Sequence, residues 1–214
     1  MPPTTYHVAV AGLLAIPLLG RQFDLRSFGV VAAAAAFPDL DGIVEIWWVG
    51  AHRTLLHNLL LPVAVAGLLV WDMHLRDSSA LRSRWGDRGV RIAWTALAAL
   101  AFAAILADAF HNGANLLWPL RDEFYEFTGS VYYSTEEGIV LEPFQPRSLG
   151  STSEVHLRTG VDMTPGDDPA GIERIFVFAE DGQQLLLTLL GYGAVGWTLH
   201  EGGAEDAAQR ADGS

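Results

Sequence analysis

Long apolar stretches limit most strongly how this chain can fold. Val90–Ala107 is the clearest of them, with Arg91 as its only charged residue. Leu55–Trp71 is a second, in which Pro62 predicts a kink, and the glycine-rich stretch Leu185–Leu199 is a third. A bilayer core is crossed by about twenty helical residues, and a helix bundle tolerates both proline and glycine. These stretches therefore predict membrane helices.

Two further apolar stretches, Val8–Gly20 and Phe28–Phe37, are short for a bilayer. They predict either short, tilted members of a bundle or a re-entrant pair joined by the link Arg21–Arg26. A cleaved signal peptide is disfavoured for the first, because no basic residue precedes it. The predicted fold class is an all-α membrane protein, a bundle of about four to five membrane helices of which two are short, with a small acidic, partly β extramembrane insert. Such a chain would be a multi-pass protein of the cell membrane, with lipid as its surrounding partner.

Composition supports a membrane protein and excludes nucleic acid as a partner. Half of the residues are hydrophobic and the mean hydropathy is +0.25. The formal net charge of −12 is opposite to what phosphate backbones require, so no nucleic-acid binding is expected. All 13 basic residues are arginine, and this acidic, lysine-free composition resembles that of halophilic proteins, in which excess carboxylate maintains solubility in salt.

The chain divides into segments of different composition. The expected units are a membrane-embedded helical bundle at 1–120, an acidic extramembrane insert at 121–184, a final membrane helix at 185–200 and a disordered tail at 201–214. Four arginines stand against thirteen Asp or Glu in the insert. Phe124–Tyr133 and Ile139–Phe144, rich in aromatic and β-branched residues on either side of Glu136-Glu137-Gly138, predict a β-hairpin there.

The arginines also predict an orientation. Arg76, Arg82, Arg84 and Arg88 lie between the apolar stretches at 55–71 and 90–107, and Arg91 follows at the start of the second stretch. These arginines mark that segment as cytoplasmic. Threading the chain outward from this segment brings all the candidate metal ligands to the opposite, extracytoplasmic face. They are His7, Asp39, Asp41, His52, His57, Asp108 and His111.

The candidate ligands have the chemistry of a metal site. Asp39 and Asp41 lie between Pro38 and Gly42, so an irregular backbone can direct both carboxylates the same way. Imidazole nitrogen and carboxylate oxygen suit zinc and other first-row divalent ions, and the chain has no cysteine to compete. The alternative is that Asp-Leu-Asp-Gly is ordinary turn chemistry and that the histidines co-occur by chance.

Helical spacing limits what two further pairs of residues can do. Asp108 and His111 are three apart and share a helical face, but both could simply be solvated among lipid headgroups. His52 and His57, five apart, do not share a helical face, so His52 is expected in the loop before the helix.

A divalent ion here, zinc first and manganese second, would activate a water for hydrolysis. Asp39 or Asp41 could then accept a proton. Arg53 could hold an anionic substrate group through its planar fork, although an arginine at such a place is often a lipid anchor.

These residues carry a resemblance to a known family. His7, Pro38-Asp39-Leu40-Asp41, His52-Arg53-Thr54-Leu55-Leu56-His57 and Asp108, followed by Gly113 and Leu116-Leu117-Trp118-Pro119, resemble the YdjM-like family of membrane-bound, metal-dependent hydrolases over about residues 6–120. The resemblance implies a relation to the zinc phospholipase C and P1 nuclease group. It further implies a metal cluster that splits a phosphoester bond in a small molecule or a lipid.

The chain departs from the family pattern at three positions. Thr54 and Leu56 stand where the family usually has Gly and Thr, and Ala104 stands where it usually has a histidine one turn before Asp108. The missing histidine would leave one metal ligand fewer. The competing hypothesis is therefore a non-catalytic membrane scaffold, or a degenerate metal-binding member of the family.

Overall fold

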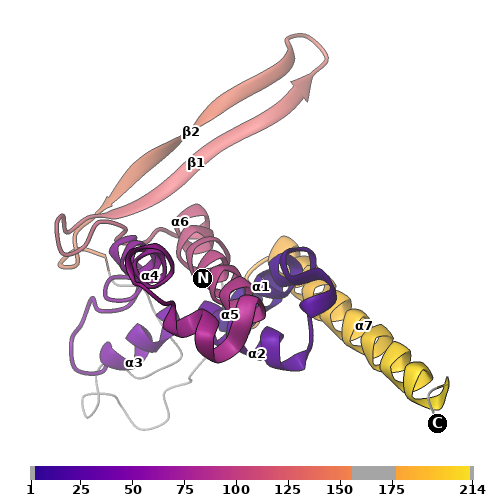
Figure 1. The fold of residues 1–214 in the computed structure, drawn as a ribbon. Helices are drawn as coiled ribbons and strands as arrows, with labels where there is room; N and C mark the ends of the chain where they lie inside the picture. Colours follow the sequence, from indigo (N-terminus) through magenta and orange to yellow (C-terminus); the bar gives the residue numbers. More distant parts are fainter. Residues whose placement is uncertain (1–2, 156–176, 213–214) are drawn as a thin grey trace, which may run out of the picture.

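The fold combines a set of helices with one two-stranded β-hairpin (Figure 1). The structure, a computed structural model, describes residues 3–155 and 177–212. Its elements are α1 (Thr4–Leu19), α2 (Leu25–Ala36), α3 (Asp41–Val44), α4 (Leu60–Val70), α5 (Ala80–Ala98), α6 (Leu106–His111), β1 (Phe124–Ser134), β2 (Gly138–Gly150) and α7 (Gly182–Asp212). A π-helical segment, Ala99–Ile105, joins α5 to α6 into one long helix, and a 3₁₀ turn, Pro38–Leu40, precedes α3.

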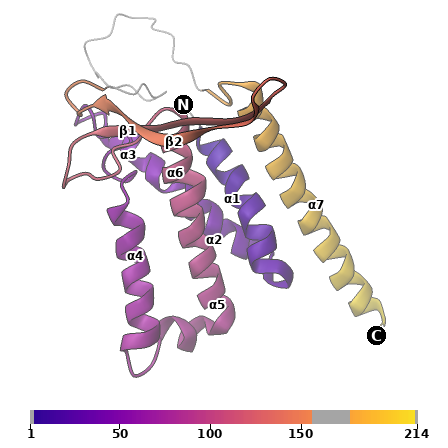
Figure 2. The same ribbon diagram turned by 90° about the horizontal axis from the view of Figure 1, so that it is seen from above.

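The long helices run side by side, which gives the molecule two distinct ends (Figure 2). The start of α1, α3, α6 and the hairpin lie at one end, and the α4–α5 turn and the end of α7 lie at the other. Small residues make this packing close. The buried core between α1, α2 and the α5–α6 helix consists of Ala11, Ala15, Leu19, Val31, Ala35, Ala96, Ala99 and Ala103.

Two helix starts are fixed by side-chain caps. The carboxylate of Asp24 accepts from the backbone N–H of Ser27, and the Ser27 hydroxyl accepts in return from the Asp24 N–H, so α2 begins with a capping box. Ser79 caps α5 by accepting from the N–H of Arg82. Within α5, Gly86 has a φ of 65°, which kinks the helix between its arginine-rich start and its apolar remainder.

The predicted all-α bundle of four to five membrane helices is wrong. Within the described residues, only Ala80–His111 is by itself long and apolar enough to cross a membrane. Leu25–Ala36 and Pro38–Val44 meet the same test together, but they are bent by 46° at their break. The other apolar stretches fall short because α1 has only 16 residues, the Leu60–Leu75 helix is also shorter than a span, and α7 mixes polar residues and glycines into its apolar run.

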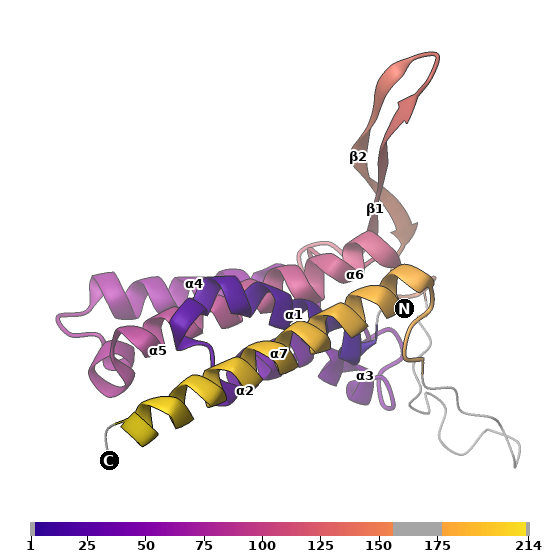
Figure 3. The ribbon, with the colours of Figure 1, turned by 90° about the vertical axis from the view of Figure 1, so that its right-hand side faces the viewer.

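The β-hairpin shows a second reason why the protein is not all-α. Its strands are antiparallel and flank the turn at Glu136–Gly138, where the sequence predicted a hairpin. Both strands are longer than expected, and a bulge shifts the register between Thr128 and Ser130. The hairpin projects from the helices roughly at right angles to their axes (Figure 3).

The C-terminal segment also differs from expectation. The tail from Glu201 was expected to be disordered, but α7 continues through it as far as Asp212. Alanine, glutamate and glutamine are good helix formers, and they dominate this part of the sequence after Gly203.

Candidate metal centre

Four separate segments bring histidine and aspartate side chains together at one end of the helices. His7 lies in the first turns of α1, and Asp39 lies in the 3₁₀ turn before α3. His57 lies in the turn-rich segment before α4, and Asp108 lies in α6. These four residues are called the His–Asp cluster below.

The distances in the His–Asp cluster fit ligands around one ion. The Nε2 atom of His7 lies 3.3 Å from Asp108 Oδ1 and 3.9 Å from Asp39 Oδ1. The Nε2 atom of His57 lies 3.0 Å from Asp108 Oδ2 and 3.4 Å from Asp39 Oδ1. Ligand atoms with bonds of about 2.1 Å to a tetrahedral ion stand about 3.4 Å from one another. His7, Asp39 and Asp108 offer one ligand atom each within 4.8 Å of one another.

Several of these atoms are buried without a hydrogen bond. His7 Nε2, His57 Nε2 and Asp108 Oδ2 are all fully enclosed and have no hydrogen-bond partner. The contact between His57 Nε2 and Asp108 Oδ2 is close, but it is not aligned as a hydrogen bond. Because a buried polar atom without a partner is costly, three of them converging on one place form a site that could hold a cation.

The other ring nitrogen of each histidine is held by an acceptor. His7 Nδ1 donates to the carbonyl oxygen of Ala103 at 2.7 Å, and His57 Nδ1 donates to Asp41 Oδ2 at 2.9 Å. In a neutral imidazole this leaves the lone pair on Nε2, the atom that faces the cluster in both residues. In the neutral form, each of the two histidines would thus offer Nε2 as a nitrogen ligand.

Asp41, His52 and Glu45 form a layer behind the His–Asp cluster. Asp41 is fully buried and also contacts His52, whose Nδ1 lies 2.9 Å from Asp41 Oδ1. Glu45 is fully buried too, and its carboxylate accepts from the backbone N–H groups of Gly50 and His52. Asp41 and His52 therefore lie close to the site, but they act on it through His57 and the loop.

Sequence reasoning missed Glu45. It stands in the apolar run Ile43–Trp48, where a lone carboxylate is unusual unless it has buried donors to accept from. A single carboxylate in such an apolar run is the sequence feature that could have identified Glu45 as a buried acceptor.

Arg53 faces inward and pairs with the cluster. It is fully buried, its Nη2 donates to Asp108 Oδ1 at 2.8 Å, and its Nη1 donates to the carbonyl oxygen of Gly113 at 3.1 Å. Its backbone has a φ of 58°, a left-handed conformation that is uncommon for a residue other than glycine. Arg53 holds Asp108 in place, while the anion-binding role suggested by the sequence would need this pair to open.

His111 and Ala104 do not take part in the described cluster contacts. His111 Nδ1 donates to Ala107 on its own helix at 2.8 Å, and its ring lies edge-on to Tyr6. Ala104 is fully buried in the π-helical segment.

The electrostatics of the site favour positive charge. Burial lowers the pKa of His57, but the carboxylates of Asp108, Asp39 and Asp41 outweigh it and raise this pKa well above its usual value. The cluster therefore attracts a cation, either a proton or a metal ion. Access is narrow, because His7, His57 and Asp108 are buried while the side chain of Asp39 is 18% exposed and accepts from the hydroxyl of Thr4.

Fold and site together define a class: a helical protein with a candidate membrane span and a buried histidine–aspartate cluster that could bind a metal ion. The chain belongs to the YdjM inner membrane protein family, whose model matches residues 1–156. This confirms the family expected from the motifs and extends it beyond residue 120 to include the β-hairpin. Comparison with curated proteins and with solved structures gave no match.

Proposed function

We propose that this protein is a membrane-bound, metal-dependent hydrolase that acts on a phosphoester of a small molecule or a lipid. The observation that carries the proposal is the set of three buried, unpartnered atoms, His7 Nε2, His57 Nε2 and Asp108 Oδ2, which face one place. Two imidazole nitrogens and two carboxylates form a donor set for zinc, with manganese as the second choice.

The residues of the site would have different roles in hydrolysis. A divalent ion held by these residues would supply an activated water and would polarise a phosphoryl oxygen. Asp108, held by Arg53, and His57, held by Asp41, keep fixed positions because their partners are buried as well. Asp39 is the cluster carboxylate with access to the surface, so it is the group suited to meet substrate and to accept a proton.

A specific observation favours a second candidate, a metal-binding scaffold without catalysis. The guanidinium of Arg53 already neutralises Asp108 inside the cluster, which lowers the demand for a metal cation. Ala104, where the family usually has a histidine, points the same way.

Metal content and turnover separate the two candidates. Purified full-length protein should contain zinc or manganese by elemental analysis, and it should cleave a chromogenic phosphodiester. Asp108→Asn should lose both properties. Asp87→Asn, a change at an exposed aspartate paired with Arg82, is the control and should keep both. Metal binding without turnover would favour the scaffold, and a protein that binds no metal would contradict both.

We further propose an orientation in the membrane. The His–Asp cluster lies near the end of the candidate span Ala80–His111, and the arginine-rich start of α5 lies at its other end. The positive-inside rule then places the arginines in the cytoplasm and the cluster at the extracytoplasmic face. Because the chain has no cysteine, single cysteines at Ser83 and Ser151 can be labelled from one side of intact cells. Labelling of both from the same side would contradict this orientation.

A further inference from the structure

The β-hairpin separates apolar and polar side chains onto its two faces. Cross-strand partners share a face, and the register pairs Val131 with Leu141 and Tyr133 with Ile139. A Cβ atom at Gly129 would meet the Phe144 ring at 2.9 Å, so that ring covers Gly129 on the same face. The apolar face consists of Phe127, Val131, Tyr133, Ile139, Leu141 and Phe144.

The opposite face is mainly polar and forms its own contacts. Thr128 pairs with Gln145 there, Ser130 donates to Glu142 at 2.5 Å, and Arg147 forms an ion pair with Glu126. Charged and hydroxyl groups on this face therefore have hydrogen-bond or ion-pair partners on the same face. Within the described residues, the side chains of the apolar face form no hydrogen bond or ion pair of this kind.

Most of the apolar face is open in the structure. Five of its six residues, all except Phe127, are between 55 and 79% exposed. In the part of the chain that the structure describes, the sheet has only these two strands and no second layer covers this face. A contiguous exposed apolar patch marks a surface that binds a partner or a membrane.

The base of this face continues into the candidate membrane span. Phe110 in α6 stacks on Phe127 with ring centroids 5.2 Å apart, and it meets Phe144 edge-on at 5.8 Å. Phe110 lies at the end of the helix Ala80–His111, and it is itself exposed. The apolar face therefore begins where that helix would leave the bilayer.

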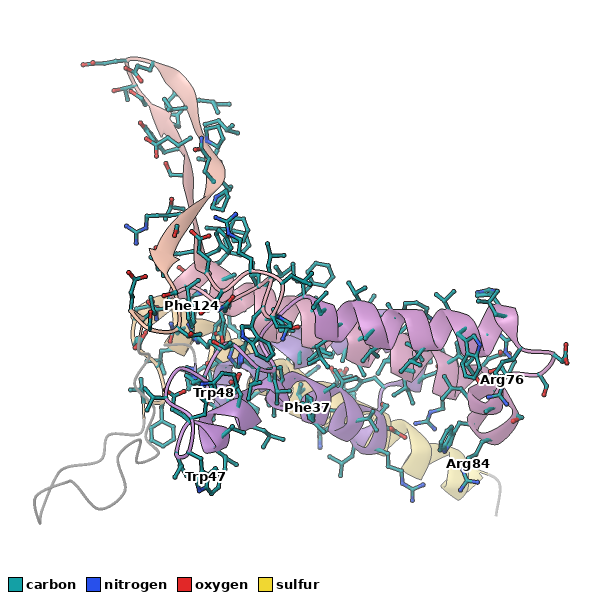
Figure 4. The ribbon with its side chains drawn as sticks, turned by 90° about the vertical axis from the view of Figure 1, so that its left-hand side faces the viewer. Phe37, Trp47, Trp48, Arg76, Arg84 and Phe124 are labelled. Carbon is teal, nitrogen blue, oxygen red and sulfur yellow. The ribbon has the colours of Figure 1, made fainter. Side chains whose placement is uncertain are left out.

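The direction of the hairpin is also consistent with a place at the bilayer surface. It stands across the helix axes, at the end of the molecule that holds the His–Asp cluster (Figures 2 and 4). A hairpin at right angles to a spanning helix lies parallel to the membrane surface. Since its apolar face meets α6 at its base, that face is directed to the side on which the helices lie.

We propose that the hairpin lies on the bilayer surface with its apolar face buried among the lipids, as a membrane-surface paddle. Amphipathic helices at a membrane surface bury their apolar face about 5–10 Å deep in the headgroup and acyl boundary, and the apolar face of the hairpin would enter the same layer. Aromatic side chains favour this interface, which suits Tyr133 and Phe144. The occupant is lipid of the membrane that the α5–α6 helix crosses, and apolar contact holds the face there. The acidic turn at Glu136 and Glu137 gives anionic headgroups no attraction.

The test uses three neighbouring positions in the full-length chain. Ile139→Cys and Leu141→Cys place a reporter on the apolar face, and Val140→Cys, an aliphatic residue between them, is the matched control on the other face. Each variant carries one nitroxide label, and the protein is reconstituted in phosphatidylcholine nanodiscs. Lipid burial raises collision with oxygen and lowers collision with a water-soluble nickel chelate. The expected result is lipid-like accessibility at 139 and 141 and water-like accessibility at 140.

Three outcomes would overturn the proposal. Equal access of the nickel chelate to all three positions would show that the face stays in water. Dipolar broadening at position 141 that disappears on dilution with unlabelled chain would assign the face to a second copy. Lipid contact that requires anionic phosphatidylglycerol would show that charge, rather than the apolar face, holds the hairpin. Helix content measured by circular dichroism should be unchanged in all three variants, because the substituted side chains lie outside the helical core.

Discussion

The guanidinium of Arg53 donates to the carboxylate of Asp108 at 2.8 Å, and both side chains are buried. The two residues are 55 positions apart, so this pair links the loop before α4 to the end of the α5–α6 helix. It also limits the freedom of Asp108, which presents its other oxygen to His57.

Replacing Arg53 should destabilise the protein strongly. Arg53→Ala breaks a buried ion pair by removing one partner, which costs about 3–5 kcal/mol of the free energy of unfolding. Arg82→Ala is the control, because this exposed arginine pairs with exposed Asp87 and should contribute about 0–1 kcal/mol. Denaturant unfolding in detergent measures both. Equal effects of the two substitutions would contradict a structural role for the buried pair.

Metal affinity should depend on Asp41 even though it lies behind the ligands. Asp41→Asn weakens the acceptor that orients His57, and loss of such a partner lowers affinity about 10–100-fold. His111→Ala should leave affinity unchanged, because its Nδ1 bonds within its own helix. Zinc titration of metal-depleted protein distinguishes the two variants. If Asp41→Asn left zinc affinity unchanged while His111→Ala lowered it, His111 would be the ligand instead.

The packing of α1 against α7 should be disrupted by an alanine substitution at one glycine of α7 and tolerate it at another. A Cβ atom at Gly191 would lie 2.5 Å from the backbone oxygen of Ala9, so Gly191→Ala must push the two helices apart. A Cβ atom at Gly193 would meet nothing within 4 Å, and alanine there should stabilise α7 by up to about 1 kcal/mol. Thermal unfolding followed by circular dichroism should show opposite shifts of Tm. Shifts in the same direction would indicate that α7 does not pack on α1 as described.

Stability should fall at low pH through Asp24. Its slight burial raises the pKa of this carboxyl, but the Ser27 cap and the Arg88 ion pair outweigh that effect and lower it to about 2. A lowered folded-state pKa means that the stabilisation is fully present above the unfolded value near 4 and is lost as the pH falls through about 2.

Asp24→Asn isolates the contribution of the charge, because asparagine can still cap α2. The difference in unfolding midpoint between the native chain and this variant should be present at pH 7 and vanish near pH 2. The difference should be modest, since the Asp24–Arg88 pair is exposed to solvent. A difference that persists unchanged at pH 2 would assign the effect to the cap instead of the charge.

Sequence motifs identified residues that meet in the His–Asp cluster, whereas the predicted number of membrane helices was wrong. Asp39, His57 and Asp108 could be found because their motifs combine metal-binding side chains with breaks in apolar segments. The carbonyl of Ala103, which fixes His7, could not be found, since any residue has a carbonyl and only the packing of α1 on the π-helical segment selects this one. Glu45 was missed because its partners are backbone N–H groups of a loop with no regular pattern.

The number of spans was overestimated for a physical reason. Apolar stretches such as Val8–Gly20 and Leu55–Trp71 look alike in sequence whether they are spans or shorter helices. In the structure, the second of these begins as the non-helical loop that carries His57, and its helix starts only at Leu60. The hairpin was easier to place, because the turn at Glu136–Gly138 and its flanking aromatic residues are local signals.

The ligand atoms of the His–Asp cluster come from residues 7, 39, 57 and 108, and so from segments that meet only when the N-terminal half has folded. In a chain without cysteine, an ion bound there would act as a cross-link between α1, the loops and α6, as a disulfide does elsewhere. Such a cross-link can close only after α6 has been synthesised. A nascent chain that ends before Asp108 would thus lack the site, and metal loading would report that the first half of the protein is in place.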